Sequence, residues 1–398
     1  MLKIDDYSRE INRCLQCNFC LATCPVYNED MVESSVARGR INLINAAMIE
    51  KSIPVTGRAR EIINRCLLCT NCMQGCPSGI PVDDIIIAAR TELFNQFGLG
   101  TVEKMLFRQL LNRKSPGTLA SRAVSLIRKL NLFPGPLPAL ASPPFEQRVS
   151  GIISPAGAPR ARVAYFIGCG TNYLYPDTGE AVVKVLVENQ IEVVVPANQS
   201  CCGIPALAHG DQQTAVESLR ANAEVFAELD VDAIITDCTS CGYMLKTKAS
   251  KVLPHDDPYR KTMALMAKKT FEVTEYLAGL GLVKKFKSRP ASITYHVPCH
   301  RGWSKGLLDA PRKLVALMPE AHLVEMKGAE KCCGAGGSTF INHSDLGAGI
   351  RSQKLEDIKA TGAAMVMTQC PACRFYLGEG LKDSSIKVLH PMSVLASA

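Results

Sequence analysis

The feature that most constrains this chain of 398 residues is a cysteine pattern that occurs twice. The doublet Cys201-Cys202-Gly203 returns as Cys332-Cys333-Gly334, and each half reads C-x31/32-CC-x35/36-C-x2-C. Corresponding cysteines lie 130 to 132 residues apart (169 to 299, 202 to 333, 241 to 373), which indicates a duplicated domain. The two sets are Cys169, Cys201, Cys202, Cys238 and Cys241, and Cys299, Cys332, Cys333, Cys370 and Cys373.

The other eight cysteines form two runs near the N-terminus, and each run is followed by a proline. Both runs read C-x2-C-x2-C-x3-C-P, which is typical of bacterial ferredoxins with two [4Fe-4S] clusters. In such a run three cysteines bind one cubane cluster and the fourth reaches the other cluster. That crossover predicts two metal sites. The first takes Cys14, Cys17, Cys20 and Cys76, and the second takes Cys66, Cys69, Cys72 and Cys24. Zinc is the alternative, because C-x2-C pairs also bind zinc.

Cysteine spacing also indicates the compartment. Tight CC and C-x2-C pairs favour metal-bound thiolates over a secreted disulfide framework. Residues 1–12 lack the apolar stretch of a signal peptide, and no run approaches the roughly 18 apolar residues of a membrane span. We expect a cytoplasmic protein, either soluble or peripheral on the inner face of the membrane.

The order of predicted elements indicates an α+β multidomain protein. An N-terminal α-helical two-cluster ferredoxin domain precedes a duplicated α/β cysteine-rich domain pair. Each half of the pair is predicted to alternate strands and helices, with its cysteines where strands end. The predicted boundaries are 1–100 for the ferredoxin domain, 101–161 for a basic helical segment and Pro-rich linker, 162–285 for the first repeat and 286–398 for the second.

Positive charge is concentrated in the segment between these domains. Residues 100–162 contain ten Lys and Arg against two acidic residues, while the whole chain has a net charge of +8. A basic helical segment with interleaved apolar residues suits an anionic membrane surface or an acidic partner, and it also suits a solvated helix face. With one Trp and no aromatic-rich basic groove, nucleic-acid binding is not expected.

Five cysteines per repeat argue against the simplest metal sites. A tetrahedral zinc and a regular cubane each need four thiolates. In an open parallel sheet, ligands gather beyond the carboxyl ends of the strands, so all five thiolates of one repeat can converge there. The count favours a larger or distorted iron–sulfur cluster.

On these eighteen cysteines the whole chain resembles the CCG-domain family of iron–sulfur oxidoreductase subunits. This family includes the iron–sulfur subunits of glycolate and lactate oxidases, the catalytic iron–sulfur subunit of heterodisulfide reductase, and one of the subunits of anaerobic glycerol-3-phosphate dehydrogenase. The resemblance implies two cubane [4Fe-4S] clusters, and one or two non-cubane [4Fe-4S] clusters held by the five-cysteine sets. It also implies an electron-transfer role between an FAD-containing 2-hydroxyacid (glycolate or lactate) dehydrogenase subunit and a quinone or an electron-transfer flavoprotein.

Two other functions stay open at the level of the sequence. A heterodisulfide reductase-type subunit would cleave a disulfide at a CCG cluster on this chain. A non-redox zinc scaffold would instead assemble partners without electron transfer.

Several remaining motifs lie close to the cysteines. The run from Gly334 to Ser338 matches no phosphate-loop motif, and close backbone approach to a cluster explains it better. No nucleotide fingerprint is present, so neither flavin nor NAD is expected on this chain. Three histidines lie near the cysteines in sequence: His209, His296 and His300. Two functional roles are open for each, namely a hydrogen bond to cluster sulfur or transfer of a proton, and the alternative is a purely structural role.

Overall fold

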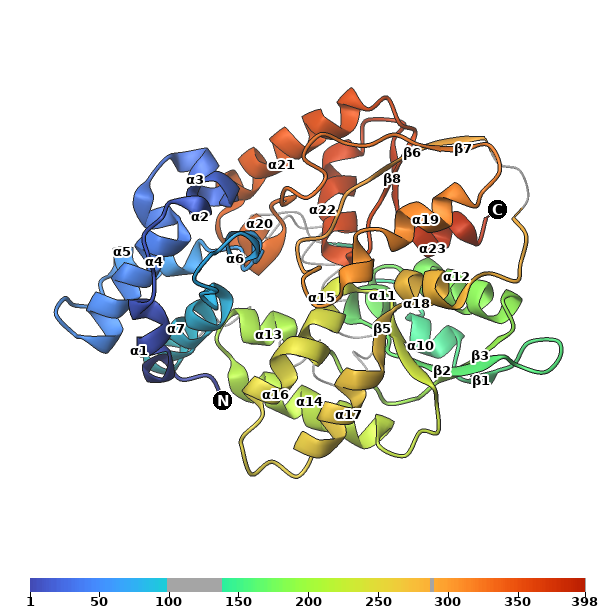
Figure 1. The fold of residues 1–398 in the computed structure, drawn as a ribbon, viewed down its shortest axis with the longest axis horizontal. Coiled ribbons are helices and arrows are strands. Elements are labelled where there is room, and N and C mark those ends of the chain that lie inside the picture. Colours follow the sequence, from blue (N-terminus) through green and yellow to red (C-terminus); the bar gives the residue numbers. More distant parts are fainter. Residues whose placement is uncertain (99–137, 287–289, 398) are drawn as a thin grey trace.

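The computed structural model describes residues 1–98, 138–286 and 290–397. Figure 1 shows a helical N-terminal region in blue beside two α/β units, coloured green to yellow and orange to red. The predicted fold class is therefore confirmed. The predicted basic helices of the segment 101–161 lie largely outside the described residues.

The N-terminal region consists of short helices that surround two cysteine-containing loops. These are η1 (Ile4–Tyr7), α1 (Ser8–Asn12), α2 (Phe19–Thr23), α3 (Pro25–Asp30), η2 (Glu33–Ser35), α4 (Ala37–Ile44), η3 (Asn45–Ile49), α5 (Gly57–Asn64), α6 (Asn71–Gln74) and α7 (Val82–Phe97). Helix α7 is buried on all sides from Val82 to Arg90, because it lies between the other N-terminal helices and the first repeat.

The first repeat contains a five-stranded sheet. Its elements are α10 (Phe145–Arg148), β1 (Gly151–Ile153), β2 (Ala161–Tyr165), α11 (Cys169–Tyr173), α12 (Pro176–Glu188), β3 (Ile191–Val195), α13 (Ile204–Ala208), α14 (Gln212–Phe226), β4 (Ala233–Thr236), α15 (Thr239–Tyr243), η5 (Met244–Lys248), α16 (Ala249–Val252), α17 (Arg260–Lys269), β5 (Thr270–Glu272) and α18 (Val273–Leu280). The strand order is β1-β3-β2-β4-β5, and all neighbours except the antiparallel β1 are parallel.

The second repeat contains a four-stranded, fully parallel sheet. Its elements are β6 (Ala291–Tyr295), η6 (Lys305–Leu307), α19 (Ala310–Ala316), β7 (Ala321–Leu323), η7 (Gly336–Ser338), α20 (Thr339–Asn342), α21 (Ser344–Ala360), β8 (Met365–Met367), α22 (Pro371–Leu381), β9 (Lys387–Leu389) and α23 (Pro391–Leu395). The order β7-β6-β8-β9 repeats β3-β2-β4-β5 strand for strand. The duplication indicated by the cysteines is therefore also present in the topology.

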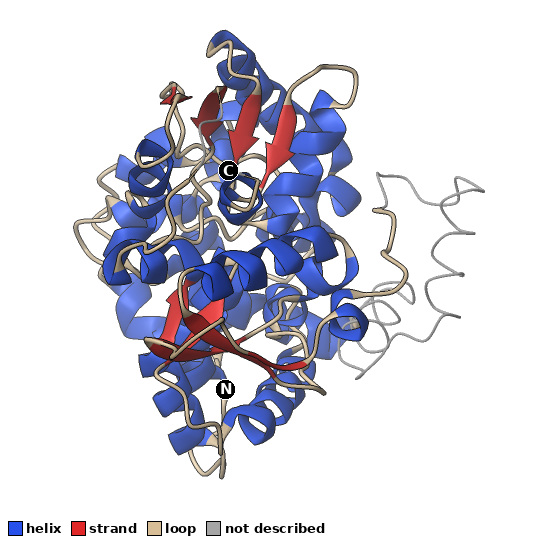
Figure 2. Cartoon of the chain, turned by 90° about the vertical axis from the view of Figure 1, so that its right-hand side faces the viewer, coloured by secondary structure: helices blue, strands red, loops and turns tan. Residues whose placement is uncertain are grey.

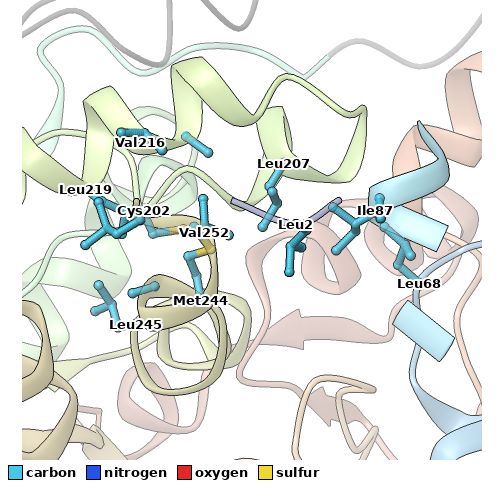
Figure 3. Packing of buried hydrophobic residues seen from close by; sticks show 14 of the residues in the cluster. Leu2, Leu68, Ile87, Cys202, Leu207, Val216, Leu219, Met244, Leu245 and Val252 are labelled. Atoms are coloured by element: carbon cyan, nitrogen blue, oxygen red, sulfur yellow. The ribbon is translucent and has the colours of Figure 1, made fainter. Parts of the chain in front are cut away.

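Successive side chains of β2 point to opposite faces of the sheet, and each face packs against a different neighbouring region. Val163 and Tyr165 belong to a hydrophobic core that continues into the second sheet, whereas Ala164 and Phe166 face the core shared with the N-terminal helices. Figure 2 shows the two sheets as separate red layers with helices between them. Figure 3 shows Leu68 and Ile87 of the N-terminal region packed near Leu207 of α13. The molecule thus has continuous packing from the ferredoxin region to both repeats.

Part of the predicted linker is folded onto the first repeat. Phe145 of α10 is fully buried, and its ring lies so close to Gly179 that a Cβ there would approach it to 2.6 Å. Residues Gly151–Ile153 form β1, which pairs antiparallel with β3. The predicted linker thus contains a short helix and an edge strand, because one aromatic side chain and a free sheet edge outweigh the effect of the surrounding prolines.

Among the residues that the structure describes, no helix combines the length and the apolar character needed to cross a lipid bilayer.

Candidate metal centres

The eight N-terminal cysteines line two small cavities in a crossed arrangement. The first cavity is lined by Cys14, Cys17, Cys20 and Cys76, and the second by Cys24, Cys66 and Cys69. Cys72 borders both cavities. The fourth cysteine of each run therefore faces the cavity formed by the other run.

Local backbone geometry produces the two cysteine loops. The residues two and four positions after the first cysteine of each run have positive φ: Gln16 and Asn18 in one loop, Leu68 and Thr70 in the other. A left-handed conformation costs a non-glycine residue about 1–2 kcal/mol, and such strain collects at ligand-binding sites. The fourth cysteine is placed differently, because Cys24 is extended and Pro25 starts α3 immediately after it.

In the first repeat, three parallel strands bring the five cysteines together. Cys169 starts α11 beyond β2, the doublet follows β3, and Cys238 and Cys241 follow β4. The thiols lie in a series in the order Cys169, Cys201, Cys202, Cys241 and Cys238, in which each thiol shifts the pKa of its neighbour. Hydrogen bonds from Cys201 and Cys241 lower the pKa of Cys202 to about 6, so Cys202 is the acceptor at the middle of the series.

The second repeat reproduces this arrangement. Its series runs Cys299, Cys332, Cys333, Cys373 and Cys370. The Sγ atoms of Cys333 and Cys373 are 3.3 Å apart. Interactions with the thiols of Cys332 and Cys373 lower the pKa of Cys333 well below its usual value.

The glycine after each doublet allows the main chain to donate to sulfur. Gly203 and Gly334 have φ of +91° and +89°. Their N–H groups donate to the Sγ atoms of Cys201 at 3.5 Å and Cys332 at 3.4 Å. A Cβ at Gly334 would lie 2.7 Å from the carbonyl oxygen of Gly347, so no other residue fits without displacement.

The glycine-rich run after the second doublet approaches the N-terminal region. A Cβ at Gly336 would lie 2.3 Å from the carbonyl oxygen of Leu67, and one at Gly337 would lie 3.0 Å from that of Cys66. The run therefore packs against the ferredoxin loop that lines the second cavity. Its close approach to a cluster, which the sequence favoured, stays a prediction.

Two cysteine sets meet at this contact. Cys69 and Cys332 lie in one buried cluster across it, and Thr70 Oγ1 donates to the carbonyl oxygen of Cys299 at 3.3 Å. The two repeats are joined in turn by the N–H of Thr239, which donates to the carbonyl oxygen of Gln369 at 3.1 Å. The second repeat is therefore in contact with both the ferredoxin region and the first repeat.

The three histidines singled out by the sequence occupy different environments. The ring of His296 lies with Cys333 and Cys373, and one ligand atom from each of the three residues lies within 4.8 Å of the other two. His300 Nε2 is 2.9 Å from the carbonyl oxygen of Leu68, and its Nδ1 is 3.0 Å from Ser240 Oγ. His209 Nδ1 is 2.8 Å from the carbonyl oxygen of Pro205, on its own helix.

The sequence did not reveal the buried polar contacts that hold the regions together. Lys248 of η5 forms buried ion pairs with Asp83 and Asp84 of α7, and Tyr243 donates a hydrogen bond to Asp83. Arg90 of α7 donates to main-chain carbonyl groups of the ferredoxin region and of the first repeat. The only available signal was two acidic residues in an apolar run, which by itself indicates no more than the first turn of a helix.

All eighteen cysteines have free thiols. Four of the five cysteines in each repeat are buried, whereas most of the ferredoxin cysteines are partly exposed and Cys17 is exposed. Converging thiols with main-chain N–H groups directed at sulfur fit the ligation of iron–sulfur clusters.

Comparison with known proteins agrees with this donor set. Residues 10–80 match the family described as 4Fe-4S dicluster domain, and residues 163–246 and 293–378 match the family described as cysteine-rich domain, CCG. The chain is 26% identical to the probable glycolate oxidase iron-sulfur subunit of Bacillus subtilis over 98% of this chain and 94% of that protein. It is 25% identical to a subunit of the fumarate reductase (CoM/CoB) of Methanothermobacter marburgensis over 99% of this chain and 73% of that protein.

A third relative is shorter. Lactate utilization protein A of an Exiguobacterium species is 30% identical, and the match covers 58% of this chain and 96% of that protein. These matches confirm the resemblance seen in the cysteine pattern. The chain belongs to the CCG-domain family of iron–sulfur oxidoreductase subunits.

Proposed function

We propose that this chain is the electron-transfer iron–sulfur subunit of a multi-subunit oxidoreductase. It relays electrons between an FAD-containing 2-hydroxyacid dehydrogenase subunit and a quinone or another electron carrier. The observation that carries the proposal is the contact between Cys69 and Cys332, because it joins the ferredoxin cysteines to the cysteines of the second repeat within one buried region.

The proposed ligands follow the four cysteine sets. Two cubane [4Fe-4S] clusters take the two crossed sets of the N-terminal region, and each five-cysteine set takes one non-cubane [4Fe-4S] cluster. When bound, such clusters supply one-electron oxidation and reduction at potentials that depend on hydrogen bonds to sulfur and on burial.

The residues of the chain supply that environment. Gly203 and Gly334 each direct a main-chain N–H group at a cysteine sulfur, and the hydrophobic cores exclude water from the doublets. Arg90 donates to the carbonyl groups of Asn64 and Cys66 at 2.9 Å and 2.6 Å, which holds the second ferredoxin loop against the repeats. Fixed donors and low solvent access favour electron transfer over loss of the clusters.

The substrate class and the flavoprotein partner are inferred from relatives. Two of them are named as a glycolate oxidase iron-sulfur subunit and a lactate utilization protein, so glycolate or lactate is the proposed substrate of the partner subunit. Copurification of the native complex tests this inference. An FAD-binding hydroxyacid oxidase is the expected companion, and a companion without flavin would contradict it.

Metal analysis tests the role of this chain directly. Four occupied sites predict about 16 irons and a similar amount of acid-labile sulfide per anaerobically purified chain. Four zinc ions without sulfide would overturn the proposal in favour of a zinc scaffold.

A cytoplasmic location with peripheral membrane contact through residues 101–161 is also proposed, on the basis of the positive charge there. The test is sedimentation with anionic vesicles. Reversing the charges of Arg122, Arg128 and Lys129 should abolish sedimentation, and unchanged sedimentation would contradict membrane contact.

A second candidate function is disulfide reduction at the second repeat. A cavity of about 290 Å³ between the N-terminal region and the second repeat is lined by Cys332, and one relative is named as part of a fumarate reductase (CoM/CoB). In this function two electrons from the flavoprotein and two protons convert a disulfide into two thiols. Addition of a disulfide to the reduced protein would change the spectrum of the second repeat, whereas an unchanged spectrum argues for electron transfer alone.

A further inference from the structure

The two CCG repeats differ at one buried position beside their cysteines. Phe166 follows β2, and its N–H donates to the carbonyl oxygen of Ile235 on β4 at 2.8 Å. His296 follows β6, and its N–H donates to the carbonyl oxygen of Met367 on β8 at 2.9 Å. Because β2 and β4 correspond to β6 and β8, these two positions are equivalent. The first repeat has a phenyl ring where the second has an imidazole.

The imidazole faces the cysteines of the second repeat. His296 is fully buried, and a ring nitrogen and the Sγ atoms of Cys333 and Cys373 all lie within 4.8 Å of one another. Among the described residues, neither ring nitrogen has a hydrogen-bond partner. A neutral imidazole always carries one N–H donor, and leaving a buried donor unpaired costs about 1–3 kcal/mol. The side chain is thus poised to donate to a group held by these cysteines.

A second difference between the repeats also places a more positive side chain near the second doublet than near the first. Asn222 on α14 donates to the carbonyl oxygen of Cys201 at 3.0 Å, next to the first doublet. The corresponding helix α21 has Lys354, whose Nζ donates to the carbonyl oxygen of Gly328 at 2.6 Å before the second doublet. Lys354 is buried, and among the described residues no carboxylate lies within 4.0 Å of its Nζ. A neutral amide in the first repeat is therefore matched by a buried cation in the second.

We propose that His296 donates its ring N–H to sulfur at the metal centre of the second repeat, and that this makes the second CCG centre more easily reduced than the first. The inference rests on the proposed function, since it requires a cluster at these cysteines. Hydrogen bonds to cluster or cysteine sulfur stabilise the more negative, reduced state and so raise the reduction potential. Phe166 offers no such donor in the first repeat.

The test uses the full-length protein, purified anaerobically and analysed first for iron and sulfide. Midpoint potentials of the two CCG centres are measured by redox titration monitored by electron paramagnetic resonance. The signal lost in the Cys370→Ser variant identifies the second centre. His296→Phe, which introduces the residue of the first repeat, should lower the potential of the second centre and leave that of the first unchanged. His296→Gln, which keeps an N–H donor, should lower it less.

His322→Phe is the matched control, because His322 is exposed on β7 and should leave both potentials unchanged. Full iron content with an unchanged potential in His296→Phe would overturn this inference alone, and so would equal shifts in the Phe and Gln variants. Absence of iron from the second repeat would overturn the proposed function as well.

One measurement needs no substitution and decides the case if His296→Phe does not fold. In protein labelled with ¹⁵N-histidine, a weak nitrogen coupling at the second centre is expected from a hydrogen-bonded ring. No coupling, or the strong coupling of a directly iron-bound nitrogen, would overturn the inference.

Discussion

Arg90 of α7 donates a hydrogen bond to the main-chain carbonyl oxygen of Cys66 at 2.6 Å, from a fully buried position. The same guanidinium donates to the carbonyl oxygen of Ala208 in the first repeat at 2.7 Å. One side chain thus links a predicted cluster ligand to a different domain. A charged donor to buried carbonyl groups contributes more than a neutral one.

Replacing Arg90 should therefore be costly. Arg90→Leu leaves carbonyl groups of both regions without a donor, and we expect a loss of at least about 3 kcal/mol in the free energy of unfolding. Urea unfolding measures the loss. Arg58→Leu is the control, because Arg58 forms an exposed ion pair with Glu61, so its loss should stay below about 1 kcal/mol. Equal stability of the two variants would show that other donors replace Arg90.

The crossed cysteine arrangement makes a specific spectroscopic prediction. If Cys24 belongs to the second ferredoxin site, the signal lost in Cys24→Ser should be the one lost in Cys66→Ser, with a loss of about four irons in each. The signal lost in Cys76→Ser should be the one lost in Cys14→Ser. The comparison is made by electron paramagnetic resonance of the reduced proteins. Matching losses in Cys24→Ser and Cys14→Ser would show that each run binds its own cluster instead.

Close contact at Gly336 predicts a steric effect. Gly336→Ala places a methyl group about 2.3 Å from the carbonyl oxygen of Leu67, so the second repeat must move away from the ferredoxin loop. We expect a loss of about 1–3 kcal/mol in the free energy of unfolding, by analogy with overpacked cores. Gly378→Ala on α22 has open space around the added methyl group and should be neutral or stabilising by up to about 1 kcal/mol. A Gly336→Ala protein as stable as the unmodified one would contradict the observed contact.

Because the carboxyl group of Glu272 is buried, we expect the free energy of unfolding to depend on pH. Burial raises the pKa of this carboxyl group from 4.5 to about 8, although the N–H of Thr274 and the amide of Gln369 each donate to Oε2 at 2.8 Å. Between these two pKa values the folded protein holds a proton that the unfolded chain has lost. Stability is therefore greatest below the unfolded pKa and falls as the pH rises towards 8, by up to about 1.4 kcal/mol per pH unit.

Urea unfolding at pH 6 and pH 8 measures this effect. The unmodified protein should lose more stability over this range than Glu272→Gln, whose amide does not titrate. Glu188→Gln is the control, since Glu188 forms a partly exposed ion pair with Lys284 and should leave the pH dependence unchanged. Identical pH dependence in the unmodified protein and Glu272→Gln would show that Glu272 does not change protonation on folding.

Much of the fold could be predicted because its signals are local. The alternation of strands and helices in each half was predicted, and the repeated cysteine spacing indicated the duplication that the two sheets show. The helix and strand at residues 145–153 were missed, because their stability comes from packing of Phe145 against Gly179 and from the free edge of β3. Neither partner is visible in the local sequence.

The same distinction applies to the site. Cysteine type and spacing determine which residues can bind metal, because ligand chemistry and short loops are local properties of the chain. Spacing could not show that Cys69 meets Cys332, that the run after Gly334 lies on the ferredoxin loop, or that His296 rather than His300 faces Cys333 and Cys373. Those relationships depend on how side chains far apart in sequence pack together, and only the tertiary structure decides that.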